Sequence, residues 1–241
     1  MPEIVDVTGG EGEEPEEAVV PGSDADLDRF FLKVGCSKQD ALTAKHLQWG
    51  WKELGKEDGA ALAFVIRNNA ACITLDLFVN EIYEEAGALV GRALADNAKL
   101  KTIDLQQAQI GVEGGRAIAE ALRVNSTLMN LKLYYNCLGP EGTRLIAEAL
   151  HANQKLTNLD LGDNGVAREG CQALASMLAV NSTLARLDIS KNAGVQGDDE
   201  VKGLMLAAQT KRQAPLNLLM TDEPGQRWSV DGFVDVVEWV R

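Results

Sequence analysis

Apolar and polar positions along most of the chain follow a two-part pattern. In residues 128–155, "LMNLKLYYNCLGPEGTRLIAEALHANQK", leucines first alternate with polar residues and then recur at a wider spacing. The alternating part, which contains Leu131 and Leu133, is typical of a short strand with one buried face. The second part, which contains Ile146 and Leu150, is typical of an amphipathic helix. The pattern therefore predicts a strand, a turn, a helix and a second turn.

The pattern returns every 28 residues. Five units, which begin at Cys72, Leu100, Leu128, Leu156 and Leu184, fill residues 72–211 without a gap. A degraded sixth unit precedes them, so the repeats extend over residues 44–211. A strand and a helix this short cannot bury an apolar face alone. We therefore expect neighbouring units to stack, with the strands side by side in a parallel sheet and the helices outside it.

The consensus of the units, LxxLxLxxNxLGxxGxxxIAxAL, resembles the leucine-rich repeat of the ribonuclease-inhibitor type. This resemblance implies an α/β fold, a curved, horseshoe-like solenoid with a concave parallel sheet, convex helices and helical caps at both ends. Two places depart from the consensus. Ala108 replaces the consensus asparagine, and "AGVQGDDE" in the last unit displaces the leucine and glycine positions. We expect both local turns to be distorted.

Asparagine recurs at two positions of the repeat. Just past the strand stand Asn80, Asn136, Asn164 and Asn192. We expect these amides to be buried and to bond backbone groups of their own and the next coil. An active-site role for Asn136, which lies between Tyr135 and Cys137, is the weaker alternative. Near the helix ends stand Asn97, Asn125, Asn153 and Asn181, where a left-handed backbone would terminate each helix.

The two ends of the chain differ from the repeats. Residues 1–26 are acidic and poor in apolar side chains, which is typical of a disordered tail. Residues 27–43 are expected to form an N-terminal cap that begins with a helix at "LDRFFLKV".

Residues 212–241 are expected to form a C-terminal cap with an amphipathic helix whose apolar face contains Val230, Phe233 and Val237. Docking of that helix into a partner's groove is an alternative to capping. All four tryptophans, Trp49, Trp51, Trp228 and Trp239, lie outside the five regular units, which favours a place in the caps.

The charge of the chain argues against nucleic acid as a partner. The net charge is −13, and residues 1–30 carry ten acids and one base. Binding to a phosphate backbone requires clustered Lys and Arg. The first 28 residues contain neither Lys nor Arg, so the chain as it stands has no secretory or transit peptide, although a presequence already removed would leave no trace. Its apolar runs are also too short for membrane insertion.

Cysteine and histidine content bears on chemistry and compartment. Four cysteines without a CxxC pair favour reduced thiols, and hence the cytoplasm or another reducing compartment. Two histidines leave few candidates for a metal site or a catalytic triad. Neither histidine shares a repeat position with a serine or cysteine, so we expect no enzyme activity, no metal and no cofactor.

Side chains that alternate with the buried leucines of each strand are expected to point to the concave face. One column of this face contains four aspartates and a lysine, in which Lys132 can pair with either neighbouring aspartate while adjacent aspartates repel. A second column contains two aromatic residues, which are typical of an interface. Alternatively, the aromatic rings only shield their neighbours. The predicted partner-binding site comprises Asp76, Phe78, Asp104, Gln106, Lys132, Tyr134, Tyr135, Asp160 and Asp188.

These patterns lead to three hypotheses about function. The first is a non-catalytic scaffold, adaptor or accessory subunit that binds a basic or mixed protein surface through the concave face. The second is a regulator of a small GTPase, because Ran GTPase-activating proteins have similar repeats and an acidic tail. The third is an actin-capping module, because the repeat domain of tropomodulin is similar in repeat number and ends with a helix. The sequence does not identify the partner, and it leaves the oligomeric state open.

Overall fold

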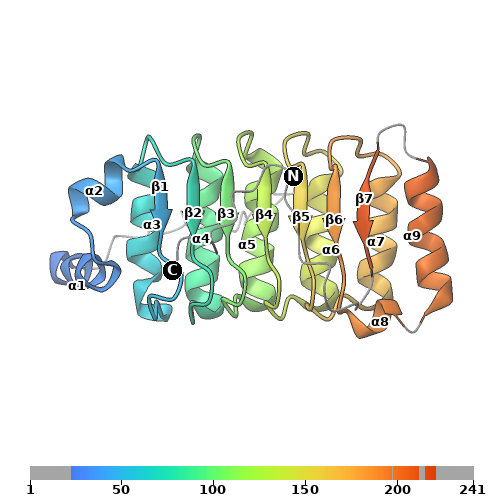
Figure 1. Cartoon of the computed structure of the whole chain (residues 1–241), viewed down its shortest axis with the longest axis horizontal. Coiled ribbons are helices and arrows are strands. Elements are labelled where there is room, and N and C mark those ends of the chain that lie inside the picture. The colour runs from blue at the N-terminus through green and yellow to red at the C-terminus, as the bar shows by residue number, and fades with distance from the viewer. Residues whose placement is uncertain (1–22, 197, 212–214, 221–241) are drawn as a thin grey trace, which may run out of the picture.

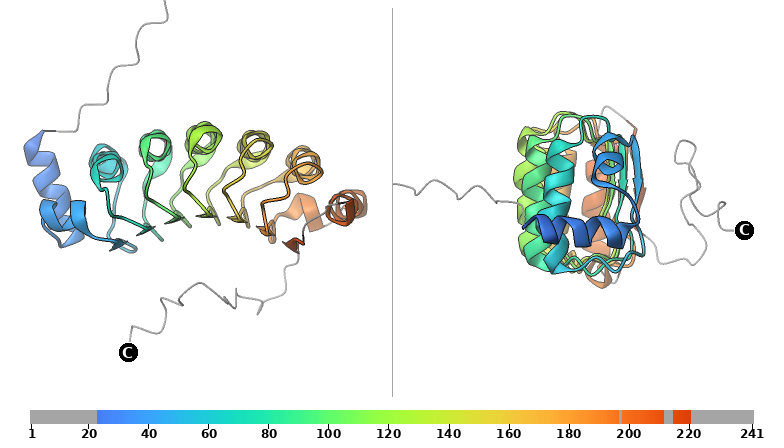
Figure 2. Two further views of the ribbon diagram at one scale, coloured as in Figure 1. Left: turned by 90° about the horizontal axis from the view of Figure 1, so that it is seen from above. Right: turned by 90° about the vertical axis from the view of Figure 1, so that its left-hand side faces the viewer.

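A computed structural model of the chain describes residues 23–196, 198–211 and 215–220. Its strands form one parallel sheet in strictly sequential order, β1 to β7. The helices that follow the strands, as far as the structure describes them, all lie on one face of this sheet (Figures 1 and 2). The strands are β1 His46–Gln48, β2 Thr74–Asp76, β3 Thr102–Asp104, β4 Asn130–Lys132, β5 Asn158–Asp160, β6 Arg186–Asp188 and β7 Asn217–Leu219.

A helix follows each of the strands β1 to β6 and returns the chain to the edge where the next strand begins. Seen from above, the helices form one row and the strands a second, gently curved row (Figure 2). The helices are α1 Asp24–Val34, α2 Lys38–Thr43, the 3-10 helix η1 Lys56–Asp58, α3 Gly59–Asn68, α4 Tyr83–Asp96, α5 Gly111–Val124, α6 Gly139–Leu150, α7 Ala167–Leu178, α8 Ala193–Gln196 and α9 Asp199–Lys211. The architecture confirms the expected solenoid of parallel strands and outer helices.

The 28-residue interval is reproduced as strand register. Leu47 pairs with Leu75, and Leu131 pairs with Leu159, each 28 positions on. The hydrogen bonds continue past the strand ends, since Leu133 N donates to Asp160 O at 2.9 Å. The leucines of successive units are fully or almost fully buried and belong to one continuous core. One shared interior, rather than separate small cores, therefore holds the units together.

The asparagines just past the strands connect each coil to the one before it. Asn136 Nδ2 donates to Leu105 O at 2.7 Å, and its Oδ1 accepts from the backbone N–H groups of Ala108 at 3.1 Å and Ile110 at 3.3 Å. Asn164 and Asn192 repeat these contacts on the coil that precedes each of them. The expected structural role is confirmed, as are bonds within the same coil, such as that from Asn136 Nδ2 to Tyr134 O at 3.2 Å, but the expected bonds to the next coil are wrong. The amides reach back to the preceding coil because their Oδ1 atoms face its turn.

Because residue 108 is alanine, the preceding coil lacks the amide contacts that an asparagine at this position would make. The turn that contains Ala108 itself is intact. Gln107 and Gln109 keep the positive φ of 55° that the corresponding residues of the next coil have. The expected distortion appears instead at Glu81, whose counterparts in the regular coils have positive φ while Glu81 does not. Among the described residues, the N–H of Ile82 has no side-chain acceptor equivalent to the one that Asn136 offers Ile110.

The helix-end asparagines form a second set of bridges, and the predicted left-handed backbone is wrong. Asn125 has φ −68° and ψ 124°, which is extended backbone. Its Nδ2 donates to Leu94 O at 2.7 Å and Asn97 O at 2.9 Å in the preceding coil, and its Oδ1 accepts from Leu128 N at 2.8 Å. Asn97, Asn153 and Asn181 make the corresponding contacts. These amides are buried because they satisfy the last carbonyl groups of the preceding helix.

At the N-terminal end, α1 and α2 cover the first coil (Figure 1). Phe30 of α1 is fully buried and meets Trp49 edge to face, with 5.3 Å between the ring centroids. Lys33 of α1 donates to Asp58, whose side chain is fully buried, at 2.8 Å. Trp49 thus belongs to the capped core as expected. Trp51 does not, because 70% of it is exposed.

The last repeat is irregular, as its sequence predicted. The short helix α8 precedes α9, and β7 begins 31 residues after β6 instead of 28 (217 − 186). Residues 221–241 of the predicted C-terminal cap over 212–241, with Trp228 and Trp239, and residues 1–22 of the predicted tail over 1–26 lie outside the described residues, while residues 24–26 already belong to α1. Both therefore stay predictions, as do the domain boundaries.

Replacement of Asn136 by Ala is expected to destabilise the protein by about 3 kcal/mol. The change leaves two buried N–H groups and one buried carbonyl without their side-chain partner, and each unsatisfied group costs roughly 1–3 kcal/mol before relaxation. Urea unfolding followed by circular dichroism measures the loss. Asn130→Ala is the matched control, since its half-buried side chain bonds only the side chains of Thr102 and Asn158 on the sheet face opposite the helices, and it is expected to cost less than about 1 kcal/mol. Equal losses for both variants would contradict the bridging role.

Candidate protein-interaction surface

The face of the sheet opposite the helices, called the concave face here, is organised in columns that cross the strands. The last position of each strand supplies Asp76, Asp104, Lys132, Asp160 and Asp188, in register from β2 to β6. Two residues further along each coil stand Phe78, Gln106 and Tyr134, followed by Gly162 and Ser190. The next position supplies Trp51, Tyr135 and Lys191. All nine residues of the predicted site thus lie on or at the edge of one face.

The aspartates of the concave face have a structural role that sequence reasoning missed. Asp76 Oδ1 accepts from Phe78 N at 2.9 Å, and Asp104 Oδ1 accepts from Gln106 N at 3.1 Å. Asp160 and Asp188 accept in the same way from the N–H two residues on. Each carboxylate therefore caps the end of its own strand. The recurrence of aspartate in this column therefore has a role in the fold.

Lys132 neutralises part of this acidic column. Its Nζ lies 2.9 Å from Asp104 Oδ2, whereas no ion pair with Asp160 is found among the described residues. Burial, opposed by the bond from Phe78 N and reinforced by Asp104, raises the pKa of Asp76. Burial, reinforced by the adjacent Asp188, raises the pKa of Asp160 to about 7. Burial is thus the main cause of both shifts, and the predicted repulsion between neighbouring aspartates adds to it at β2 and at β5.

Tyr134 is held in place by two later coils. Its hydroxyl donates to Asp163 Oδ2 at 3.3 Å, and Lys191 Nζ donates to that hydroxyl at 3.0 Å. The ring lies against Gly162, where a Cβ would come within 2.9 Å of it. Lys191 Nζ also lies 5.1 Å from the ring centroid. This tyrosine is therefore a rigid element of the face, not a loose side chain.

Two aromatic side chains project from the face towards solvent. Trp51 is 70% exposed and meets Phe78 edge to face, with 5.7 Å between the centroids. Tyr135 is 50% exposed and lies beside Tyr134, with 6.2 Å between the centroids. Each pair combines one supported ring with one accessible ring. Trp51 and Tyr135 are three repeat intervals apart, which corresponds to roughly 14 Å at the usual strand spacing.

Sequence reasoning missed Trp51 and Asp163 as members of this surface, and it missed a contact of Lys191. Trp51 was expected in a cap, although it has the same repeat position as Tyr135. Asp163 and Lys191 were not expected to contact Tyr134, because their link joins coils up to 57 residues apart. The first strand column, which contains polar Asn130 and Asn158 bonded to each other, was also overlooked. The shared interval of 28 residues would have identified Trp51.

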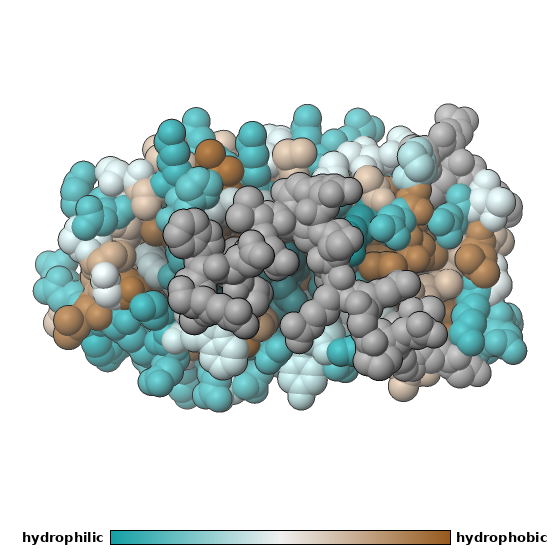
Figure 3. Space-filling view, viewed as in Figure 1, coloured by the Kyte–Doolittle hydropathy of each residue, from teal (hydrophilic) through white to brown (hydrophobic). Residues whose placement is uncertain are grey.

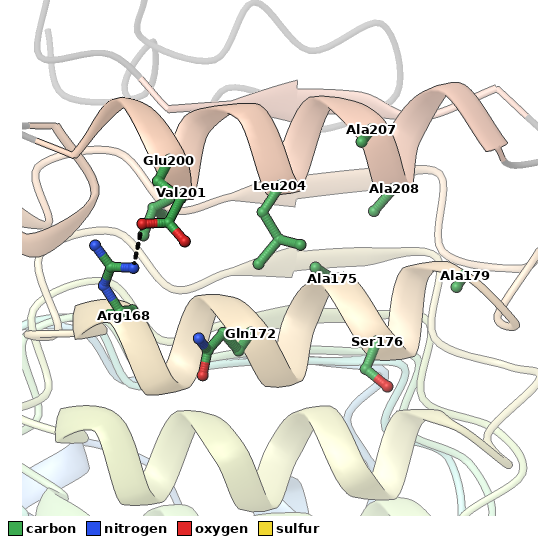
Figure 4. A pocket seen from close by; sticks show the side chains of 10 residues that line it. All are labelled: Arg168, Gln172, Ala175, Ser176, Ala179, Glu200, Val201, Leu204, Ala207 and Ala208. Atoms are coloured by element: carbon green, nitrogen blue, oxygen red, sulfur yellow. Dashed lines mark hydrogen bonds and ion pairs between the residues drawn. The ribbon is translucent and has the colours of Figure 1, made fainter.

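A groove of about 550 Å³ lies on the helical side, between α7 and α9. Its walls are mostly apolar, with Ala175, Leu204 and Ala208, and Arg168 bonds Glu200 at its end at 2.7 Å (Figure 4). Ser176 is its only hydroxyl among the ten lining residues, and no histidine or lysine lines it. This groove therefore offers no nucleophile with a base in hydrogen-bond reach.

Within the described residues, no cluster of three His, Cys, Asp or Glu side chains suits a metal ion. The four cysteines are free thiols, and burial raises the pKa of Cys72 and Cys171 to about 11. These two thiols are thus poor nucleophiles at neutral pH. The helices of the described part include none long and apolar enough to cross a membrane.

Comparisons with known proteins agree with this architecture. A family model described as Leucine Rich repeat matches residues 96–119 and 152–175. No curated protein sequence matches the chain. A solved structure described as "Leiomodin-1 Actin-Binding Site 2 (ABS2)" aligns with a TM-score of 0.54 and 22% identity, over 63% of this chain and 87% of that chain. The tropomodulin C-terminal domain of Caenorhabditis elegans aligns with a TM-score of 0.51 and 14% identity, over 64% and 92%. At these identities, the two structures share the fold with this chain.

Asp160→Asn is expected to make the protein more stable at pH 8 than the wild type, by on the order of 2 kcal/mol. The folded state holds the Asp160 proton more tightly than the unfolded state does, because its pKa is raised to about 7 from 3.8. Stability from this group is therefore lost as the pH rises from about 4 to about 7. The asparagine keeps an oxygen for Gly162 N and has no charge to bury.

Urea unfolding of both proteins at pH 4, 6 and 8 measures this difference. The other carboxyl groups are common to both proteins, so their pH dependence cancels. A difference in unfolding free energy that stays constant over this range would contradict the raised pKa.

Proposed function

Because the chain is a leucine-rich-repeat protein, we propose that it is a non-catalytic interaction scaffold that binds a protein partner through its concave face. The observation that carries the proposal is the pair of exposed rings, Trp51 and Tyr135, each backed by a second ring on the sheet. Rigid, accessible aromatic side chains are typical of binding hot spots because they bury a large area at a low cost in conformational entropy.

The charges of the face support a partner of mixed or basic character. Asp76 and Asp104 line the sheet near the first aromatic pair, and Asp104 forms an ion pair with Lys132. Asp163 and Lys191 lie near the second pair and engage the Tyr134 hydroxyl. A partner with an apolar ridge and one or more Arg or Lys side chains would complement the first half, because carboxylates at an interface favour cations.

The helical face supports this choice of surface. Its charged side chains are largely engaged with one another, as in the pairs of Arg144 with Glu141 and of Arg168 with Asp198. Such exposed pairs contribute little to binding. Free thiols at all four cysteines support a reducing compartment, the cytoplasm among them, as part of this proposal.

Actin is the second candidate partner, and one comparison favours it. The leiomodin structure that shares this fold is described as an actin-binding site. The sequence identity of 22% with that structure gives no residue-level support, so actin serves as a defined protein to test first. Regulation of a small GTPase stays a prediction from the sequence.

Substitution of Trp51 or Tyr135 by Ala is expected to weaken partner binding by about 30-fold or more each, since loss of a hot-spot ring costs roughly 2 kcal/mol. Affinity capture with quantitative mass spectrometry identifies proteins that both variants lose. Co-sedimentation with filamentous actin tests the second candidate in the same set. Val124→Ala, an equally exposed apolar change at the end of α5, is the matched control.

Tyr134→Phe adds a finer test, because it keeps the ring and removes the hydroxyl that Asp163 and Lys191 hold. We expect an intermediate loss of binding without a loss of fold. A set of partners, actin included, that binds all these variants as it binds the wild type would rule out the concave face as the binding site.

A further inference from the structure

A second groove, of about 670 Å³, runs along the edge at which the strands begin. Its lining residues fall between 71 and 183 and come from five successive coils, so it crosses most of the solenoid. Ile73 and Met129 contribute apolar surface, and Met129 is 40% exposed. Thr157 and Thr183 contribute polar atoms. We call it the strand-start groove. In Figure 3, hydrophilic side chains alternate with apolar ones along this upper edge.

The strand-start groove is basic on a strongly acidic protein. Three exposed lysines, Lys99, Lys101 and Lys155, line it, and no carboxylate does. Within the part of the chain that the structure describes, none of these lysines has an ion-pair partner. By contrast, acids dominate the opposite edge, where Glu81, Glu84 and Glu85 are exposed. An exposed basic strip with an apolar floor is suited to an extended acidic segment that carries aliphatic side chains.

One segment of this chain has that composition. Residues 1–22 contain seven acids and neither Lys nor Arg. They also carry two short aliphatic runs, "IV" followed by Val7, and "AVV" at 18–20. The segment joins the described part at Ser23, directly before α1.

The segment is long enough to reach the strand-start groove. Twenty-two extended residues span up to roughly 75 Å. The coils that line the groove are spread over roughly 20 Å, at about 4.8 Å per strand. Since α1 lies beside the first coil (Figure 1), the segment need not be fully extended to cover the whole groove.

We propose that the strand-start groove binds the chain's own acidic segment, residues 1–22, and so acts as an internally occupied site for acidic peptides. Lys99, Lys101 and Lys155 contact the carboxylates, and the apolar floor around Met129 receives the aliphatic runs. Because the segment is tethered, its effective concentration at the groove is on the order of millimolar, so weak contacts suffice for occupancy. An acidic partner would have to displace it. This surface is distinct from the concave face, so the inference does not depend on the proposed function.

Zero-length coupling of carboxylates to amines with a carbodiimide tests the proposal in the full-length protein. The coupled lysines are identified by mass spectrometry of the monomer. We expect residues 1–22 to couple to Lys99, Lys101 and Lys155 at least about fivefold more than to Lys56, an exposed lysine on the opposite edge. In about 1 M NaCl the preference should fall at least about threefold, because the Debye length shrinks to about 3 Å.

A charge reversal that leaves target lysines in place provides the matched comparison. Lys101→Glu should lower coupling to Lys99 and Lys155 by about threefold, while Lys56→Glu should leave it unchanged. Unchanged circular dichroism verifies that both variants are folded. Coupling to the groove lysines no greater than to Lys56, or no coupling of residues 1–22 at all, would overturn the proposal. Coupling found only between two chains, and lost on dilution, would overturn it as well, because the groove would then take a second copy's segment.

Discussion

The stack depends on buried side-chain amides that tie each coil to the coil before it. Parallel strands of three residues offer few backbone hydrogen bonds, and the turns at both ends leave N–H and C=O groups without a ladder partner. The strand-end and helix-end asparagines satisfy these groups from inside the core, with distances of 2.7 to 3.3 Å at Asn136 and Asn125. The cost of leaving such groups unpaired in a dry interior is what makes the arrangement cooperative.

The surface follows from the same constraint. Once the amides fix the coils in register, equivalent side chains of neighbouring coils lie about 4.8 Å apart, and columns of aspartates or of aromatic residues arise from the repeat itself. Strand-capping bonds hold the aspartates, and contacts from the two following coils hold Tyr134. The concave face is therefore preorganised, which lowers the entropy that a partner must lose on binding. Trp51 and Tyr135 remain accessible on this rigid support.

The interval of 28 residues was enough to predict the strands, the helices, the shared core and the structural role of Asn136. It was not enough to predict direction or local geometry. Whether an amide reaches forward or back is not encoded in a periodic pattern, and Ala108 consequently affects Glu81 in the preceding coil. We predicted a left-handed backbone at Asn125 because asparagine tolerates one. The structure has an extended backbone there, which places the buried amide against Leu94 O. The contacts of Tyr134 with Asp163 and Lys191 depend on how far each side chain reaches across neighbouring coils, and the repeat pattern contains no information on this reach.

Native-state hydrogen exchange of individual backbone amides tests the bridging role of asparagine most directly. The backbone N–H groups of Ile110 and Val166 each donate to an asparagine Oδ1 in the following coil. Ile82 lacks this acceptor because the equivalent residue of its following coil is Ala108. We predict that the amides of Ile110 and Val166 exchange only with global unfolding, and that Ile82 exchanges at least about 30-fold faster, in keeping with the loss of roughly 2 kcal/mol of protection. Protection of Ile82 equal to that of Ile110 would contradict the account, since the coils would then be held in register without the amides.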